Sequence, residues 1–195
     1  MHTIEPYYNW RDYYIASEDK NSPFFNNNYD EFKFSQKIYN YFIHPQWDNI
    51  ESSTLFLKVL QADYVRGYAI IELIGEWNDC LNNDIMLLKT NLTDCLSYDG
   101  IDKFILIGEN ILNFHASDDC YYEEWKHESD EGWIVLMNFR EHVIEEMREA
   151  NIHHHFFINP MFNDLPWRKF TPDNLCDLVE DLLIEKIPKE ISSGY

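Results

Sequence analysis

The sequence predicts an α/β protein with a single mixed, mostly parallel sheet of four to five strands, opened by a β-hairpin and covered by helices. Two observations predict this class. Short apolar runs alternate with amphipathic stretches through residues 53–187, and strand–helix alternation produces right-handed crossovers and parallel strands. The first two runs are instead separated only by a polar turn, which makes the opening strand antiparallel.

The opening runs lie in residues 53–75, on either side of a turn that contains Asp63, Arg66 and Gly67. A helix is expected over residues 82–97, because apolar residues recur there at steps of three and four. Gly100 follows that helix, where glycine tolerates a left-handed backbone. Residues 103–110 are short, branched and apolar, as in a fully buried strand.

The remaining elements alternate in the same way. Ser117 is expected to cap a helix, and Thr171 to cap the last helix, with Pro172 at its first position. The expected ranges are a strand at 132–139, a helix at 140–151, a strand at 153–160 and a helix at 171–187. Residues 188–195 are expected to form a frayed tail.

Residues 1–52 form an N-terminal extension that is rich in aromatic residues and asparagine. Disordered segments are poor in aromatics, so we expect this arm to pack on the main domain. Residues 34–44 are predicted to form a short helix, with Ser35 as its N-cap. Docking to a partner is the alternative role of the arm.

The chain is strongly acidic, with 35 Asp and Glu against 15 Lys and Arg and a net charge of −20. Such a field repels nucleic acid and anionic membranes, so neither is an expected partner. The sequence shows no secretory leader, no apolar run that could cross a bilayer and no C-x-x-C pair among its four cysteines. A cytoplasmic location is expected.

The stretch Leu-Ile-Gly-Glu occurs twice, ending at Glu76 and at Glu109. We interpret both copies as strands that leave a parallel sheet, which places the two glutamates at one edge. Ligands of open α/β sheets usually bind there. The candidate residues near this edge are Glu76, Asp79, Glu109, Asn110, His115, Ser117, Asp118, Asp119, Asn138 and Arg140, with Asn159 after the last strand.

Two interpretations of these polar residues remain open. Carboxylates and amides could bind Mg²⁺ or carry out acid–base chemistry, and they could equally cap helices and form turns. A separate metal hypothesis concerns His153, His154 and His155, because two histidines on one strand face need only a further ligand, such as His142 or Glu146. No cofactor is indicated, since no phosphate-binding or nucleophile motif occurs.

Three stretches resemble a STAS domain, the fold of anti-sigma-factor antagonists. They are AIIELIGEWNDCLNNDIMLLKTNLTDCL (69–96), FILIGENILNFHASDDCYYEEW (104–125) and GWIVLMNFREHVIEEMREANIHHHFFI (132–158). The resemblance implies a regulatory domain over residues 53–187. The family's phospho-acceptor motif, Asp-Ser-Ser-Gly or Asp-Ser-Thr-Gly, is replaced here by Ala116-Ser117-Asp118-Asp119, so phospho-switching is not implied.

The leading functional hypothesis is a non-catalytic regulatory or protein-interaction module with a protein partner. The first alternative is a metal-dependent hydrolase that uses the acids at the strand ends. The second is a structural protein that self-assembles, with a homodimer as its simplest form. The absence of a strong catalytic motif favours the first hypothesis.

Overall fold

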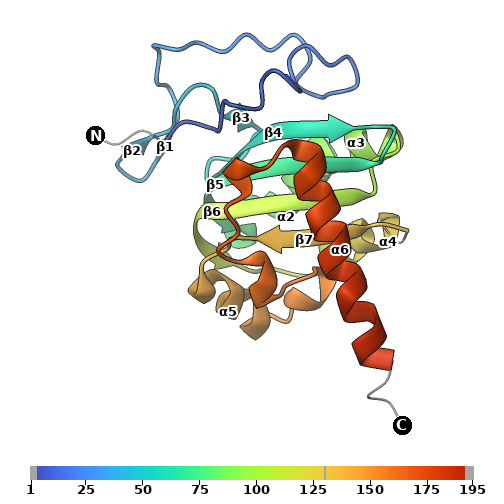
Figure 1. The fold of residues 1–195 in the computed structure, drawn as a ribbon. Helices are drawn as coiled ribbons and strands as arrows, with labels where there is room; N and C mark the ends of the chain where they lie inside the picture. Colours follow the sequence, from blue (N-terminus) through green and yellow to red (C-terminus); the bar gives the residue numbers. More distant parts are fainter. Residues whose placement is uncertain (1–3, 130, 192–195) are drawn as a thin grey trace.

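The computed structural model describes residues 4–129 and 131–191 and confirms an α/β fold built on a mixed five-stranded sheet (Figure 1). The strands lie in the order β3-β4-β5-β6-β7. Their bounds are β3 (Asp48–Asn49), β4 (Leu55–Asp63), β5 (Tyr68–Asn78), β6 (Lys103–His115) and β7 (Trp133–Met137).

The predicted hairpin is confirmed. Strands β4 and β5 pair antiparallel from Leu55 opposite Gly75 to Asp63 opposite Tyr68, with an irregularity near Val59. Strand β5 then pairs with β6, and β6 with β7, in parallel. All eleven residues of β5 are buried, because it is the central strand and is covered on both faces.

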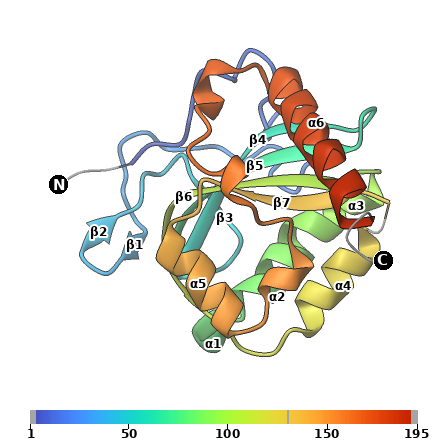
Figure 2. The same cartoon turned by 60° about the horizontal axis from the view of Figure 1, so that its bottom comes forward.

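One face of the sheet is covered by four helical segments (Figure 2). The predicted helix at 82–97 is present as a continuous helical stretch that is π-helical in its middle, and the next two helices follow β6 and β7. The segments are α1 (Asp79–Asn82), the continuous stretch α2 (Asp84–Leu88), η1 (Lys89–Thr93, π-helical) and α3 (Asp94–Tyr98), then α4 (Cys120–Glu128) and α5 (Glu141–Glu149). Their apolar sides form one core with the sheet.

The opposite face is covered by α6 (Pro172–Ile191), which crosses the strands in both views. Leu175, Cys176 and Val179 are fully buried against the sheet. Thr171 accepts a hydrogen bond from the Asn174 backbone (3.3 Å), as expected for its N-cap role. The helix continues four residues beyond the predicted end at 187, and residues 192–195 lie outside the described part of the chain.

The N-terminal extension differs from the prediction in one element. Instead of a helix at 34–44 it contains a small hairpin of β1 (Lys37–Ile38) and β2 (Tyr41–Phe42). Aromatic and β-branched residues favour extended backbone, and Tyr39 takes a left-handed conformation (φ 52°) in the two-residue turn. Strand β3, also in the extension, pairs with β4 and so belongs to the main sheet.

The prediction that the two Gly-Glu pairs end their strands is wrong. Strand β5 continues to Asn78 and β6 continues to His115. The glycines instead allow close approach. A Cβ on Gly75 (φ 114°) would lie 2.1 Å from the Thr54 carbonyl oxygen, and one on Gly108 would lie 2.4 Å from the Phe139 ring.

Two further predictions, one for residues 153–160 and one for the start of α4, are wrong. The expected strand at 153–160 is reduced to one parallel bridge between Val135 and Phe157, because the chain coils before and after it. The short 3₁₀ turns are η2 (His153–His155), η3 (Pro160–Phe162) and η4 (Trp167–Lys169). Helix α4 begins at Cys120 with Asp119 at the N-cap position, so Ser117 is not its cap.

Candidate ligand-binding site

An open cleft of about 790 Å³ lies where β7 ends and its parallel pairing with β6 stops, after Ile107 and Met137. It is bounded by the first residues of α5 and by the loop that follows the Val135–Phe157 bridge. Of the residues predicted from sequence, Glu109, Asn138, Arg140 and Asn159 line it. The other lining residues are Phe139, Glu141, Ile144, Arg148, Ile158, Pro160, Asn163, Asp164 and Leu165.

Asn138 fixes the floor of this cleft. It leaves β7 in a left-handed conformation (φ 55°), which asparagine tolerates better than most residues. Its amide nitrogen donates to Glu109 (3.0 Å) and to the Leu165 carbonyl (2.9 Å), and its amide oxygen accepts from the Leu165 backbone (3.0 Å). Together, the three bonds hold the loop at Leu165 beside Glu109 of β6.

Glu109 is the acidic residue of the floor, and three donors hold its carboxylate. Trp167 donates from its indole nitrogen (2.8 Å), Arg168 from its guanidinium (2.7 Å), and Asn138 from its amide. Partial burial would raise the pKa of Glu109, but these hydrogen bonds hold it below the ordinary value. Glu109 is therefore an ionised, fully engaged group.

The two arginines of the cleft have fewer interactions with other protein groups than Glu109 has. Arg140 and Arg148 are both exposed, and Arg140 donates only from Nε to the Glu109 carbonyl (3.3 Å). The ion pairs among the described residues use other cations, chiefly Lys58, Arg66, Lys89, Lys103 and Arg168. The cleft thus offers two guanidinium groups that form no ion pair within the described chain.

A second, apolar hollow of about 250 Å³ adjoins the cleft beneath the β1–β2 hairpin. Arg140 lines both hollows, so it marks the boundary between them. Asn110, another predicted residue, lies in the apolar hollow. Its other walls are Ile4, Ile38, Tyr41, Phe42, Ile43, Ile74, Gly75 and Leu112.

Glu76 and Asp79 are not in the cleft. Glu76 accepts hydrogen bonds from Tyr39 and from Asn113 (2.8 Å). Asp79 accepts from Tyr122 (2.6 Å) and from the Ile85 backbone (2.9 Å), and burial raises its pKa to about 6 despite these bonds. Glu76 and Glu109 therefore share no partner, although the repeated motif suggested that they are neighbours.

The remaining predicted residues lie beside the start of α4. His115 ends β6 opposite Asn78. Asp118 accepts from the Cys120 backbone (3.3 Å), and Asp119 lies within 4.0 Å of His155. His142 and Glu146, the further ligands suggested for the three histidines, have other contacts: His142 contacts the Leu112 carbonyl (2.7 Å), and Glu146 accepts from the Phe114 backbone (2.7 Å).

Sequence reasoning missed Glu72, which is almost fully buried in the middle of β5. Its carboxylate accepts from the Tyr7 backbone (2.9 Å) and lies 3.6 Å from Arg168. Burial raises the pKa of Glu72 to about 7, against both of these contacts. The available signal was a single acid inside the apolar run Tyr68–Ile74.

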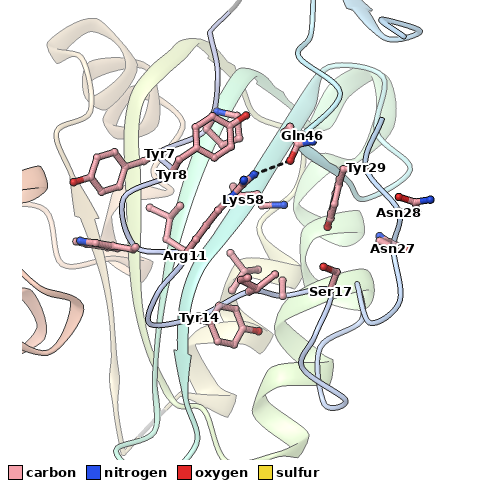
Figure 3. A pocket seen from close by; sticks show the side chains of 16 residues that line it. Tyr7, Tyr8, Arg11, Tyr14, Ser17, Asn27, Asn28, Tyr29, Gln46 and Lys58 are labelled. Atoms are coloured by element: carbon pink, nitrogen blue, oxygen red, sulfur yellow. Dashed lines mark hydrogen bonds between the residues drawn. The ribbon is translucent and has the colours of Figure 1, made fainter. Parts of the chain in front are cut away.

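A smaller pocket of about 280 Å³, between the arm and β4, was also missed (Figure 3). Tyrosine rings surround Arg11 and Lys58, but both cations are engaged. Arg11 donates to Gln46 (2.8 Å), and Lys58 pairs with Asp48 (3.2 Å) and lies over the Tyr29 ring. We interpret this pocket as part of the contact between arm and sheet.

Comparison of the chain with protein families, curated proteins and solved structures finds no match. No helix among the described residues has both the length and the apolar content needed to cross a membrane.

Proposed function

We propose that this protein is a non-catalytic interaction module that binds a segment of a partner protein at the carboxyl edge of its sheet. The segment places an apolar side chain in the hollow beneath the β1–β2 hairpin and an acidic side chain on Arg140. The observation that carries the proposal is the position of Arg140, which borders both the polar cleft and the apolar hollow.

The chemistry of the two hollows fits a peptide. An apolar anchor in a pocket beside a charge-assisted hydrogen bond is a common way to recognise short segments. Tyr41, at the rim of the apolar hollow, is 61% exposed and available for contact. Because Glu141 and Asp164 also lie on the rim and the whole chain is acidic, the partner should be neutral or basic apart from the acid that meets Arg140.

The geometry gives less support to a hydrolase that uses the strand-end acids. The carboxylates of Glu76, Asp79 and Glu109 are each held by donors of the protein itself, and within the described part of the chain none of them belongs to a group of three ligand-type residues close enough to hold a metal ion. Glu72 has the most suitable pKa for acid–base work, but it is 2% exposed and covered by Tyr7 and Arg168. A catalytic acid must reach its substrate.

The STAS resemblance agrees with this proposal. The chain order of hairpin, helical segment, strand, helix, strand and helix follows the order that the resemblance implied, up to α5. The stretch at the position of the phospho-acceptor, residues 116–119, precedes α4 and contains two acids. We propose a STAS-like regulatory domain that works by binding rather than by accepting phosphate.

Selection from a random peptide library tests the proposal. The wild-type protein should enrich peptides that carry an aromatic or aliphatic residue beside an acidic one. For a peptide so obtained, Arg140→Glu should weaken binding at least tenfold in fluorescence polarisation, because it replaces attraction with repulsion. Tyr41→Ala should weaken it less.

Lys20→Glu is the matched control, because Lys20 is exposed in the arm and the change in net charge is the same. This variant should bind the peptide within twofold of wild type. Equal weakening by both variants would mean that only overall charge matters. That result, or a library that yields no enriched sequence, would contradict a peptide site at Arg140.

A further inference from the structure

Three side chains from two separate segments meet beside the start of α4. They are Asp119, at the N-cap of α4, and His154 and His155 in the 3₁₀ turn η2. One ligand atom from each lies within 4.8 Å of the other two. The two imidazole rings are adjacent, with centroids 3.9 Å apart.

His155 is the unusual member of this group. Its side chain is only 4% exposed, yet neither ring nitrogen has a hydrogen-bond partner among the described residues. Leaving a buried polar group unpaired is costly, and most buried imidazoles donate or accept at least one bond. Nε2 of His155 is directed toward the Asp119 carboxylate, 4.0 Å away, which is too long for a hydrogen bond.

The ligand types and spacing suit a divalent transition metal. Zn²⁺ binds imidazole nitrogen and carboxylate oxygen at about 2.0–2.2 Å, which places tetrahedral ligands roughly 3.4 Å apart. Asp119 and His154 are exposed, so their side chains can rotate by the small amount needed to close the group. An adjoining hollow of about 310 Å³, lined partly by Ser129 and Phe156, leaves room for a water ligand.

We propose that Asp119, His154 and His155 form a Zn²⁺ site with three protein ligands and one exchangeable water. The bound ion satisfies the buried His155 ring and joins η2 to the first turn of α4. A positive charge lies beside the group, because the Lys126 ammonium donates to the His154 carbonyl (2.9 Å). The excess of acids in the chain favours a cation in spite of it.

Titration of the metal-free protein with Zn²⁺, followed by calorimetry, tests the site. The measurements use a Cys80→Ser, Cys120→Ser background, because both thiols are exposed and could bind zinc independently. One Zn²⁺ per chain should bind, and Co²⁺ in its place should give the visible absorption of a four-coordinate ion. Asp119→Asn and His154→Ala should each lower the affinity at least tenfold, and neither change disturbs the core because both side chains are exposed.

Asp118→Asn and His153→Ala are the matched controls, since these residues adjoin the ligands but lie outside the group. They should bind Zn²⁺ within threefold of the background protein. The proposal is overturned if the background protein shows no saturable binding, or if His154→Ala and His153→Ala lose affinity equally. The second result would indicate binding to any exposed histidine of this stretch.

Discussion

At the scale of single residues, two glutamates near the same arginine have pKa values that shift in opposite directions. Arg168 lies 2.7 Å from Glu109 but 3.6 Å from Glu72, and Glu109 also has hydrogen bonds from Asn138 and Trp167. The pKa of Glu109 is lowered, whereas burial raises that of Glu72 to about 7. The deeper burial of Glu72 is the largest cause of the difference, and the closer ion pair and additional donors of Glu109 stabilise that carboxylate in its charged form.

The raised pKa of Glu72 predicts that this residue makes the free energy of unfolding depend on pH. Its folded-state pKa of about 7 lies above the ordinary value of 4.5, so the folded state binds the proton more tightly than the unfolded state. The contribution of Glu72 to stability is complete below pH 4.5 and is lost as the pH rises through 7. Glu72→Gln cannot ionise, so its stability relative to wild type should rise over this range by at most about 3 kcal/mol.

Urea unfolding of both proteins at a series of pH values measures this difference. Glu145→Gln is the matched control, because it makes the same chemical change at an exposed position on α5. A difference between Glu72→Gln and wild type that stays constant, or that falls with pH, would show that folding does not raise the pKa of Glu72.

At the scale of elements, the sequence predicted those whose periodicity was long and regular. The β4–β5 hairpin, α5 and α6 lie within a few residues of their predicted positions, because each has an unbroken apolar pattern that the core requires. The helix at 82–97 was predicted as one piece, and its apolar stripe is buried. The apolar spacing gives no signal of the π-helical turn η1 in its middle.

The elements that were predicted wrongly are short and depend on tertiary contacts. The β1–β2 hairpin has two residues per strand, and Ile38 is buried against Ile74 and Phe56 of the main sheet. Residues 153–160 have the composition of a strand but make one bridge, because η2 and η3 take the chain out of the sheet. Propensity over so few residues is easily overridden by packing.

The sequence predicted only some of the residues that line the candidate site. Glu109, Asn138 and Arg140 line one cleft as predicted, because the pairing of β6 with β7 stops at Ile107 and Met137, close to where both strands were expected to end. Glu76 and Asp79 were grouped with them because the strands were expected to end earlier. Arg168 and Trp167, which hold Glu109, lie in a loop far along the chain, and nothing in the sequence indicates their contact.

The arm gives a prediction at this scale. Trp10 is 3% exposed, packs on Trp167 with the α6 core, and donates from its indole to the Phe170 carbonyl (3.0 Å). Trp10→Ala should lower the free energy of unfolding by about 3–5 kcal/mol, because it leaves a large cavity and an unpaired carbonyl. Urea unfolding followed by circular dichroism measures the change.

Tyr13→Ala is the matched control, since Tyr13 is in the same segment but 58% exposed. Its replacement should change stability by no more than about 0.5 kcal/mol. If Trp10→Ala is as harmless as Tyr13→Ala, the arm does not contribute to the folded core. That result would also favour the alternative in which the arm serves mainly to contact a partner.

At the scale of the whole molecule, the large excess of acidic residues affects the stability of the folded state. Several of the 15 basic residues are committed to ion pairs, among them Lys58 with Asp48 and Lys89 with Asp94 and Glu128. The surplus of acids gives the folded protein a net charge of −20 in a small volume. Unfolding separates these charges, so their repulsion opposes the compact state.

Salt should therefore stabilise the protein. Raising the ionic strength from about 0.01 M to about 0.15 M shortens the screening length from about 30 Å to about 8 Å, which removes most of the repulsion across the molecule. The Tm should rise by several degrees in NaCl, and KCl should have the same effect, because screening does not depend on the identity of the ion. A Tm that stays constant or falls would mean that local ion pairs outweigh the overall repulsion.

The same measurement with MgCl₂ separates the two leading functional hypotheses. An Asp119→Asn variant is used, so that the proposed zinc site does not contribute. If the carboxylates at the strand ends are engaged only with protein donors, Mg²⁺ at matched ionic strength should raise the Tm no more than Na⁺ does. An additional rise that saturates at modest Mg²⁺ would indicate specific binding to the folded state and would favour the metal-dependent hydrolase over the interaction module.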